Sequence, residues 1–324
     1  MRRPLQKLSL TLGRSTLLPS AFSSSRQPID ITDEAPPDGT PVPPGHHLVY
    51  FTPNGLEKDL GADGTDRTFN APAPFTRRMW AGGKMVWPGA DDADGGGGLR
   101  VGDVAEERTK LLSATAKKSR SAGEMVLVEV EKEVWTPRGL TLVDNRSWVF
   151  RPEIHQNQVT TSTPPKMIEA DVRAPSLLED TQNTDGSTVR HARWSPTALF
   201  RFSALTFNGH KIHYNEDWTG TVEGHPGIVV HGPLNLIAML DYWRDVHGRS
   251  RWPRDITYRA MAPVYAGEKY LLRTEEMGRE DGWKVVVDKC GVVCMQGEIT
   301  GTRQRGQSHV KTSPLRKMTQ HLQN

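Results

Sequence analysis

Residues 227–246 place the strongest limit on the fold. They begin with a strand-like segment, Gly227–Val230, and pass through a sharp His231-Gly232-Pro233 turn into an apolar run, Leu234–Leu240. Proline is favourable in the first turn of a helix because its missing N–H would be unpaired there, so a helix is predicted from Pro233 to about Val246. A helix that is apolar on all sides is buried, and about a dozen residues are too few to span a bilayer. The stretch therefore indicates a sheet wrapped around a buried helix.

The start of this helix is suited to binding an oxygen that becomes negative. Its first N–H groups lack intrahelical partners, and the helix dipole is positive at that end. Gly232 lets another group approach the backbone closely. Upstream, the polar run Asn208–His213 holds two histidines that can move protons near neutral pH. The alternative is an ordinary strand-to-helix turn with surface histidines.

The polar run resembles the signature of the MaoC-like hydratase/dehydratase group, Asp-x-Asn-Pro-(apolar)-His. Laid on this chain, the signature residues fall on Asn208, His210, Lys211, Ile212 and His213. More specifically, residues 207–214 followed by 230–234 are similar to fungal mitochondrial 3-hydroxyacyl-thioester dehydratases and to the related mesaconyl- and itaconyl-CoA hydratases. The resemblance extends to Arg77–Gly83 and covers roughly residues 43 to 310.

The resemblance implies an α+β fold of two tandem hotdog folds, each a curled antiparallel sheet around a central helix. At 324 residues the chain has room for two domains of about 100 to 150 residues each. The loss of periodicity in residues 152–189 marks the boundary. The predicted divisions are a transit-peptide-like segment at 1–29, an N-terminal hotdog domain with an extended arm at 30–155, a linker at 156–189, a C-terminal hotdog domain carrying the catalytic motif at 190–310, and a polar tail at 311–324.

Several elements are predicted in the first half. Alternating side chains indicate strands at Met125–Trp135 and Leu140–Arg151. Leu48–Phe51 is a short strand candidate, and the first domain's helix is expected near Val101–Lys118. The resemblance makes Arg77–Gly83 the helix entry or part of the wall of the acyl site.

The resemblance also assigns roles in adding water to, or removing it from, an acyl thioester. His213 is the expected proton-transfer residue, and the N–H of Gly232 is expected to bind the thioester oxygen. Asn208 stands where the signature has Asp; an amide cannot act as a general acid or base, although it can hold a hydroxyl group or a water. Either His213 moves the protons alone, or a nearby acid, Glu216 or Asp217, completes a pair.

Four further residues are expected to bind substrate: His231, His210, Arg77 and Trp80. If residues 210 and 213 lay in one strand, their side chains would point to opposite faces. Arginines at 77, 78 or 201 could pair with a phosphate or carboxylate of the substrate. Surface arginines beside a packed tryptophan are the alternative.

The net charge of +3 depends on the N-terminus. Residues 1–29 carry five of the 41 bases and no acid, so the remaining chain has 36 bases against 38 acids. No basic excess is left for binding nucleic acid. The Arg- and Ser-rich, acid-free N-terminus is typical of a mitochondrial transit peptide and indicates the matrix; a merely disordered N-terminus is the alternative.

No motif requires a metal or an organic cofactor. The two cysteines, Cys290 and Cys294, form neither a Cys-x-x-Cys motif nor a zinc pattern. The expected partner is an acyl thioester of acyl carrier protein or CoA. The two halves are expected to form an internal pseudo-dimer, with a possible homodimer and no membrane insertion.

Three hypotheses for the function remain: a 3-hydroxyacyl-thioester dehydratase of mitochondrial fatty acid synthesis, a dicarboxylic acyl-CoA hydratase, and a hotdog protein that binds acyl thioesters without turnover.

Overall fold

A ten-stranded antiparallel sheet dominates the computed structural model, which describes residues 2–17, 28–91, 98–119, 123–154, 170–248, 251–278 and 281–302. The strands are β1 (Thr16–Leu17), β2 (Ile29–Asp30), β3 (Arg77–Val86), β4 (Glu106–Ser119), β5 (Gly123–Thr136), β6 (Gly139–Arg151), β7 (Leu177–Gln182), β8 (Thr188–Arg193), β9 (Pro253–Ala260), β10 (Tyr270–Met277), β11 (Gly282–Lys289) and β12 (Val292–Gly301). The helices are α1 (Arg3–Thr11), α2 (Pro196–Leu205), α3 (Glu216–Thr221) and α4 (Gly232–Val246), with short 3-10 helices η1 (His46–Val49), η2 (Glu57–Asp59) and η3 (Lys211–His213).

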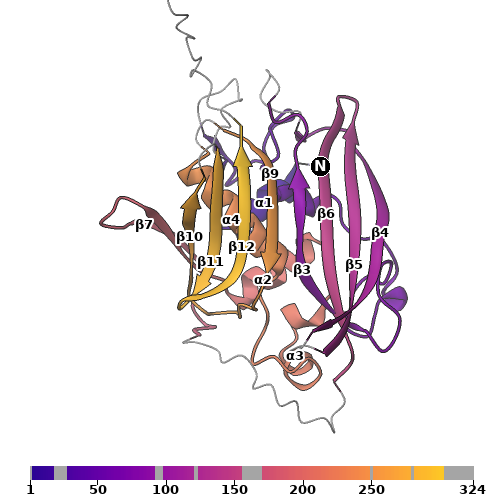
Figure 1. The fold of residues 1–324 in the computed structure, drawn as a ribbon. Coiled ribbons are helices and arrows are strands. Elements are labelled where there is room, and N and C mark those ends of the chain that lie inside the picture. Colours follow the sequence, from indigo (N-terminus) through magenta and orange to yellow (C-terminus); the bar gives the residue numbers. More distant parts are fainter. Residues whose placement is uncertain are drawn as a thin grey trace, which may run out of the picture.

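The two halves of the chain share this sheet. Its strand order is β4-β5-β6-β3-β9-β12-β11-β10-β8-β7, so the first half forms one side and the second half the other (Figure 1). They join where β3 pairs with β9, with Gly83 opposite Tyr258. A Cβ at Gly83 would lie 2.0 Å from the Asn145 carbonyl oxygen and 2.7 Å from the Tyr258 hydroxyl. Glycine at this position therefore permits the close approach that joins the halves.

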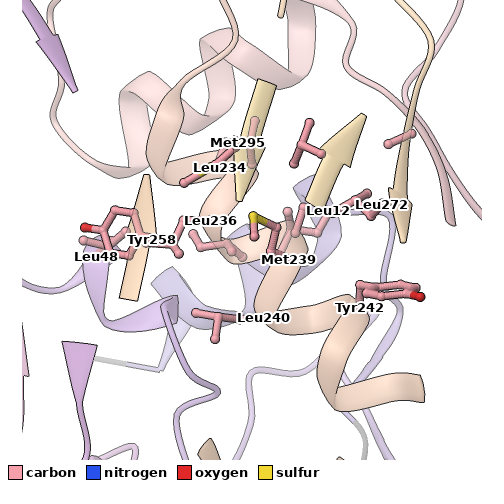
Figure 2. Packing of buried hydrophobic residues seen from close by; sticks show 14 of the residues in the cluster. Leu12, Leu48, Leu234, Leu236, Met239, Leu240, Tyr242, Tyr258, Leu272 and Met295 are labelled. Atoms are coloured by element: carbon pink, nitrogen blue, oxygen red, sulfur yellow. The ribbon is translucent and has the colours of Figure 1, made fainter. Parts of the chain in front are cut away.

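The helix predicted from residue 233 is confirmed as α4. It lies against one face of the second-half strands (Figure 1), and every residue from Leu234 to Trp243 is buried. Figure 2 shows that its side chains share one hydrophobic cluster with Leu12 and Leu48 from the N-terminal part of the chain. A helix that is apolar on all sides is thus covered by the sheet on one side and by N-terminal segments elsewhere.

Two predictions for the first half are wrong. Residues 101–118 do not contain its helix, because β4 occupies residues 106–119 and pairs along its length with β5. Main-chain pairing at this sheet edge outweighs local helix preference. Leu48–Phe51 is not a strand, because the 3-10 helix η1 occupies residues 46–49, next to α4: a Cβ on Gly45 would lie 3.1 Å from Leu240. The strands predicted at 125–135 and 140–151 are confirmed as β5 and β6.

The N-terminal segment is part of the folded core. In α1, Leu5 and Leu8 are fully buried, and α1 contacts α2 and η1. Beyond α1, the Arg14 guanidinium pairs with Asp241 at 3.1 Å and with Asp245, both in α4. Residues 3–17 thus pack against the rest of the fold, while the transit-peptide-like character of residues 1–29 stays a prediction. Composition alone did not reveal that the leucines of this segment have a buried surface to cover.

The predicted linker at 156–189 contains regular structure near its C-terminal end. Residues 177–182 form β7, which pairs with β8 at the edge of the sheet. Residues 155–169 and the predicted tail at 311–324 lie outside the described residues. In the described part of the chain, no helix has the length and apolar character needed to cross a membrane.

Candidate active site

A cavity of about 1200 Å³ lies between the two halves. The first half contributes Arg78 and Trp80 from β3 and Arg151 from β6, and the second half contributes His213 and Gly232. The predicted wall at 77–83 is a strand rather than a helix entry, but its Trp80 does face this cavity.

His213 is held as a neutral base. Its Nδ1 lies 2.8 Å from the Val229 carbonyl oxygen. Because a carbonyl can only accept, Nδ1 must carry the ring proton, and Nε2 keeps its lone pair. Burial lowers the pKa of His213 to about 4. Nε2 is therefore free to accept a proton at neutral pH.

The 3-10 helix η3 brings His210 and His213 side by side. Side chains three residues apart lie over one another in a 3-10 helix, and the two ring centroids are 5.3 Å apart. Both rings line the cavity. The opposite-face geometry considered for a strand does not apply, because residues 211–213 are helical.

His231 supports the site from behind. Its ring stacks on His213, with centroids 3.6 Å apart and an interplanar angle of 17°. Its Nε2 lies 2.9 Å from the Ser203 hydroxyl, on α2, and burial lowers its pKa well below the ordinary value. His231 is not among the residues that line the cavity. His231 thus packs behind His213, and its contact with substrate stays a prediction.

Gly232 presents, at the tip of α4, an amide for which no hydrogen-bond partner is found within the described residues. The N–H groups of Leu234 and Asn235 both bond to the His231 carbonyl, and Pro233 has no N–H. The amide of Gly232 is thus the donor left at this helix terminus. Trp80 packs against Gly232: a Cβ at position 232 would lie 3.2 Å from the indole.

Asn208 lines the cavity but is partly engaged. Its Oδ1 accepts a hydrogen bond from the main-chain N–H of His210 at 3.1 Å, so its Nδ2 is the group left for a ligand. The suggested acids Glu216 and Asp217 lie exposed at the start of α3 and do not line the cavity. Neither of them completes a pair with His213.

Asp63 is the acid that sequence reasoning missed. Its carboxylate is buried, and its Oδ2 lies 3.7 Å from Nε2 of His210. Burial lowers the pKa of His210 well below the ordinary value. Because Asp63 lies about 150 residues before the motif, no local spacing rule could have indicated the contact.

The arginines expected to contact substrate, and one further arginine that lines the cavity, differ in their partners. Arg77 does not line the cavity; its Nε pairs with Glu223 at 2.8 Å, which does not support the predicted contact with substrate. Arg78 lines the cavity and donates to the Asp66 carbonyl at 3.1 Å. Arg151 lines the cavity, and its buried Nε has no hydrogen-bond partner among the described residues. Arg201, the third candidate cation, is exposed on α2 and does not line the cavity.

Comparisons with known proteins show the family of the chain. Residues 45–266 match the family described as hydroxyacyl-thioester dehydratase type 2. The chain is 32% identical over 233 residues to a mesaconyl-C(4)-CoA hydratase of Chloroflexus aurantiacus, covering 71% of this chain and 74% of the relative. It is 24% identical over 248 residues to the mitochondrial hydroxyacyl-thioester dehydratase type 2 of Schizosaccharomyces pombe, covering 74% and 79%.

Solved structures show the same fold. A MaoC-like dehydratase superposes with a TM-score of 0.60 at 12% identity, covering 94% of both chains. A MaoC-like dehydratase from Phytophthora capsici gives 0.55 at 14% identity, covering 94% of this chain and 93% of the other. The predicted α+β fold of two tandem hotdogs is confirmed. The helix expected for the first domain at residues 101–118 is a strand instead. The chain belongs to the hydroxyacyl-thioester dehydratase type 2 family and is a hydro-lyase.

Proposed function

We propose that this protein interconverts 3-hydroxyacyl and 2-enoyl thioesters by removing or adding water. The observation that carries the proposal is one cavity holding both a neutral His213, whose Nε2 accepts protons, and the unpaired amide of Gly232. A base beside a preorganised N–H donor is what enolate formation next to a thioester carbonyl requires.

In dehydration, Nε2 of His213 removes the proton from C2 of the substrate. The electron pair of that bond moves into the thioester, and the resulting negative oxygen is bound by the Gly232 N–H and the α4 dipole. The C2=C3 double bond then forms as the C3–O bond breaks, and the leaving hydroxide takes the proton from His213 to depart as water. Hydration uses the same groups in reverse, and Nδ2 of Asn208 holds the hydroxyl group.

We place this reaction in mitochondrial fatty acid synthesis, on chains carried by acyl carrier protein or CoA. The support is the name of the S. pombe relative and the transit-like composition of residues 1–29. Location in the matrix and pairing into a homodimer belong to the same proposal.

A dicarboxylic acyl-CoA such as mesaconyl-CoA is the second candidate substrate. The observation that favours it is Arg151, a cavity-lining cation for which no acidic partner is found among the described residues, beside the 32% identity to a mesaconyl-C(4)-CoA hydratase. If this candidate holds, Arg151→Gln raises KM for a dicarboxylic substrate at least about tenfold and leaves straight-chain substrates unchanged. The exposed Arg67→Gln variant is the control.

A panel of 3-hydroxyacyl and enoyl thioesters, carried by CoA and by acyl carrier protein, tests the function directly. Loss or gain of enoyl absorbance reports turnover. His213→Ala is expected to lower kcat roughly 100- to 10,000-fold, whereas His191→Ala, at an exposed histidine of β8, leaves it unchanged. Binding of thioesters with no turnover by the wild type on any member of the panel refutes the proposal.

A further inference from the structure

A loop of the first half is docked onto the motif of the second. The main-chain N–H of Lys211 donates to the Asp63 carbonyl at 2.8 Å, and its Nζ donates to the Ala62 carbonyl at 2.7 Å. Gly64 adopts φ +83°, and a Cβ there would lie 2.1 Å from the Gly209 carbonyl oxygen. Only glycine fits this contact, so the position of Asp63 is fixed to the main chain beside His210.

Asp63 has one carboxylate oxygen engaged and one free. Oδ1 accepts from the N–H of Thr65 at 2.9 Å and from its hydroxyl at 2.8 Å. Oδ2 is buried without a hydrogen-bond partner among the described residues, and the same is true of Nε2 of His210. These two atoms are 3.7 Å apart, about 1 Å longer than a hydrogen bond.

Two buried, unpaired polar atoms facing each other are costly unless they pair. Catalytic hydrogen bonds are often long without substrate and tighten in the substrate complex. A hydrogen bond from Nε2–H of His210 to Oδ2 of Asp63 satisfies both atoms, and it leaves Nδ1 as the ring nitrogen available to a ligand. The carboxylate that Asn208 lacks is thereby supplied from the other half of the chain.

We propose that Asp63 is a positioning residue for the water chemistry. It fixes His210 as the Nε2–H tautomer, so that Nδ1 of His210 accepts a hydrogen bond from the 3-hydroxyl group or from the attacking water. Asp63 and His210 form no covalent bond with the substrate, and His213 still carries the proton between C2 and oxygen. The proposal rests on the proposed function and adds the acid–imidazole pair that orients the oxygen.

Asp63→Asn separates this role from a structural one. The amide keeps an oxygen for Thr65 but replaces the free oxygen with an NH2 group, which cannot accept from Nε2–H. We expect kcat to fall about 10- to 100-fold, with KM within about threefold and the melting temperature nearly unchanged. Asp59→Asn removes an exposed carboxylate of the same segment and leaves kcat unchanged. An Asp63→Asn enzyme with wild-type kcat overturns the proposal.

A double-mutant cycle tests whether Asp63 acts through His210. In a His210→Gln background, Asp63→Asn is expected to lower kcat less than about twofold further, because residues that act as a unit are not additive. Independent, multiplicative losses contradict the assignment.

The tautomer of His210 can also be read in the wild type, without any substrate. Imidazole nitrogen shifts measured by NMR are expected to show a protonated Nε2 and an unprotonated Nδ1. The opposite tautomer overturns the proposal even if Asp63→Asn fails to fold. Because this readout needs no turnover, its result does not depend on the result of the thioester assay.

Discussion

The two halves of the molecule share one sheet but differ in what packs against it. The second half contributes six strands, has α4 packed against them, and carries His210, His213 and Gly232. In the first half, strands β4, β5 and β6 run for 13 to 14 residues, and no long helix packs on them within the described residues. The first half contributes a wall (Trp80, Arg151) and the docked loop with Asp63. The difference teaches that, in the proposed mechanism, one half holds the reacting groups while the other encloses and orients them.

The largest expected effect concerns the N-terminal segment that helps to cover α4. Leu8→Ala removes a fully buried side chain from α1 and is expected to lower the free energy of unfolding by about 2 to 5 kcal/mol. Leu10→Ala, on the exposed side of the same helix at 37% exposure, is expected to change it by less than about 0.5 kcal/mol. Denaturant unfolding measures both. Equal, small effects would mean that residues 3–17 are a dispensable leader.

The next effect is a pH dependence of stability that originates in the second half. The pKa of His213 is about 4 in the folded protein and about 6.5 in an unfolded chain. Between these values the unfolded state binds more protons, so stability falls as the pH falls from about 6.5 to 4. We expect His213 to account for about 3 kcal/mol of that loss.

Unfolding free energies of the wild type and of His213→Gln, measured at pH 7 and pH 4, test this value. The variant should lose that share of the pH dependence. His225, whose pKa is also about 4 because of burial, contributes in the same direction in both proteins. An identical pH dependence in the two proteins would show that His213 is not held neutral.

The smallest expected effect tests the role of the docked loop at residues 61–65. Gly64→Ala places a methyl group against the Gly209 carbonyl and is expected to lower kcat/KM about 100-fold, because displacement of a positioned group by about 1 Å has that effect. Gly39→Ala is the matched control: Gly39 has φ +84° but open space around its Cβ. Both variants carry the same backbone strain, so equal activities would mean that the loop plays no part in catalysis.

The sequence predicted the second half far better than the first. The apolar run 234–240 and Pro233 located the start of α4 to within one residue. The burial of a helix and the residue preferences of its first turn can both be read from neighbouring residues in the sequence. The helix expected at 101–118 failed because β4 is defined by its pairing with β5, which is a tertiary contact. The motif singled out His213 and Gly232, and both line the cavity.

The parts of the site that the sequence missed are those built by contacts between the halves. Asp63 reaches His210 only because the loop at 61–65 bonds to Lys211. Arg77 and Arg78 are adjacent in sequence, yet β3 directs Arg78 to the cavity and Arg77 to Glu223. Alternation along a strand decides such a choice once the buried face is known, and the sequence did not show that residues 77–86 are a strand.

The most direct test of the central claim is hydration of an enoyl-CoA in deuterium oxide, followed by mass spectrometry of the product. If His213 carries the proton to C2, the wild type forms a 3-hydroxyacyl-CoA with a single deuterium at C2, and His213→Gln forms almost none. A product without deuterium at C2, or equal product formation by the variant, would contradict the account.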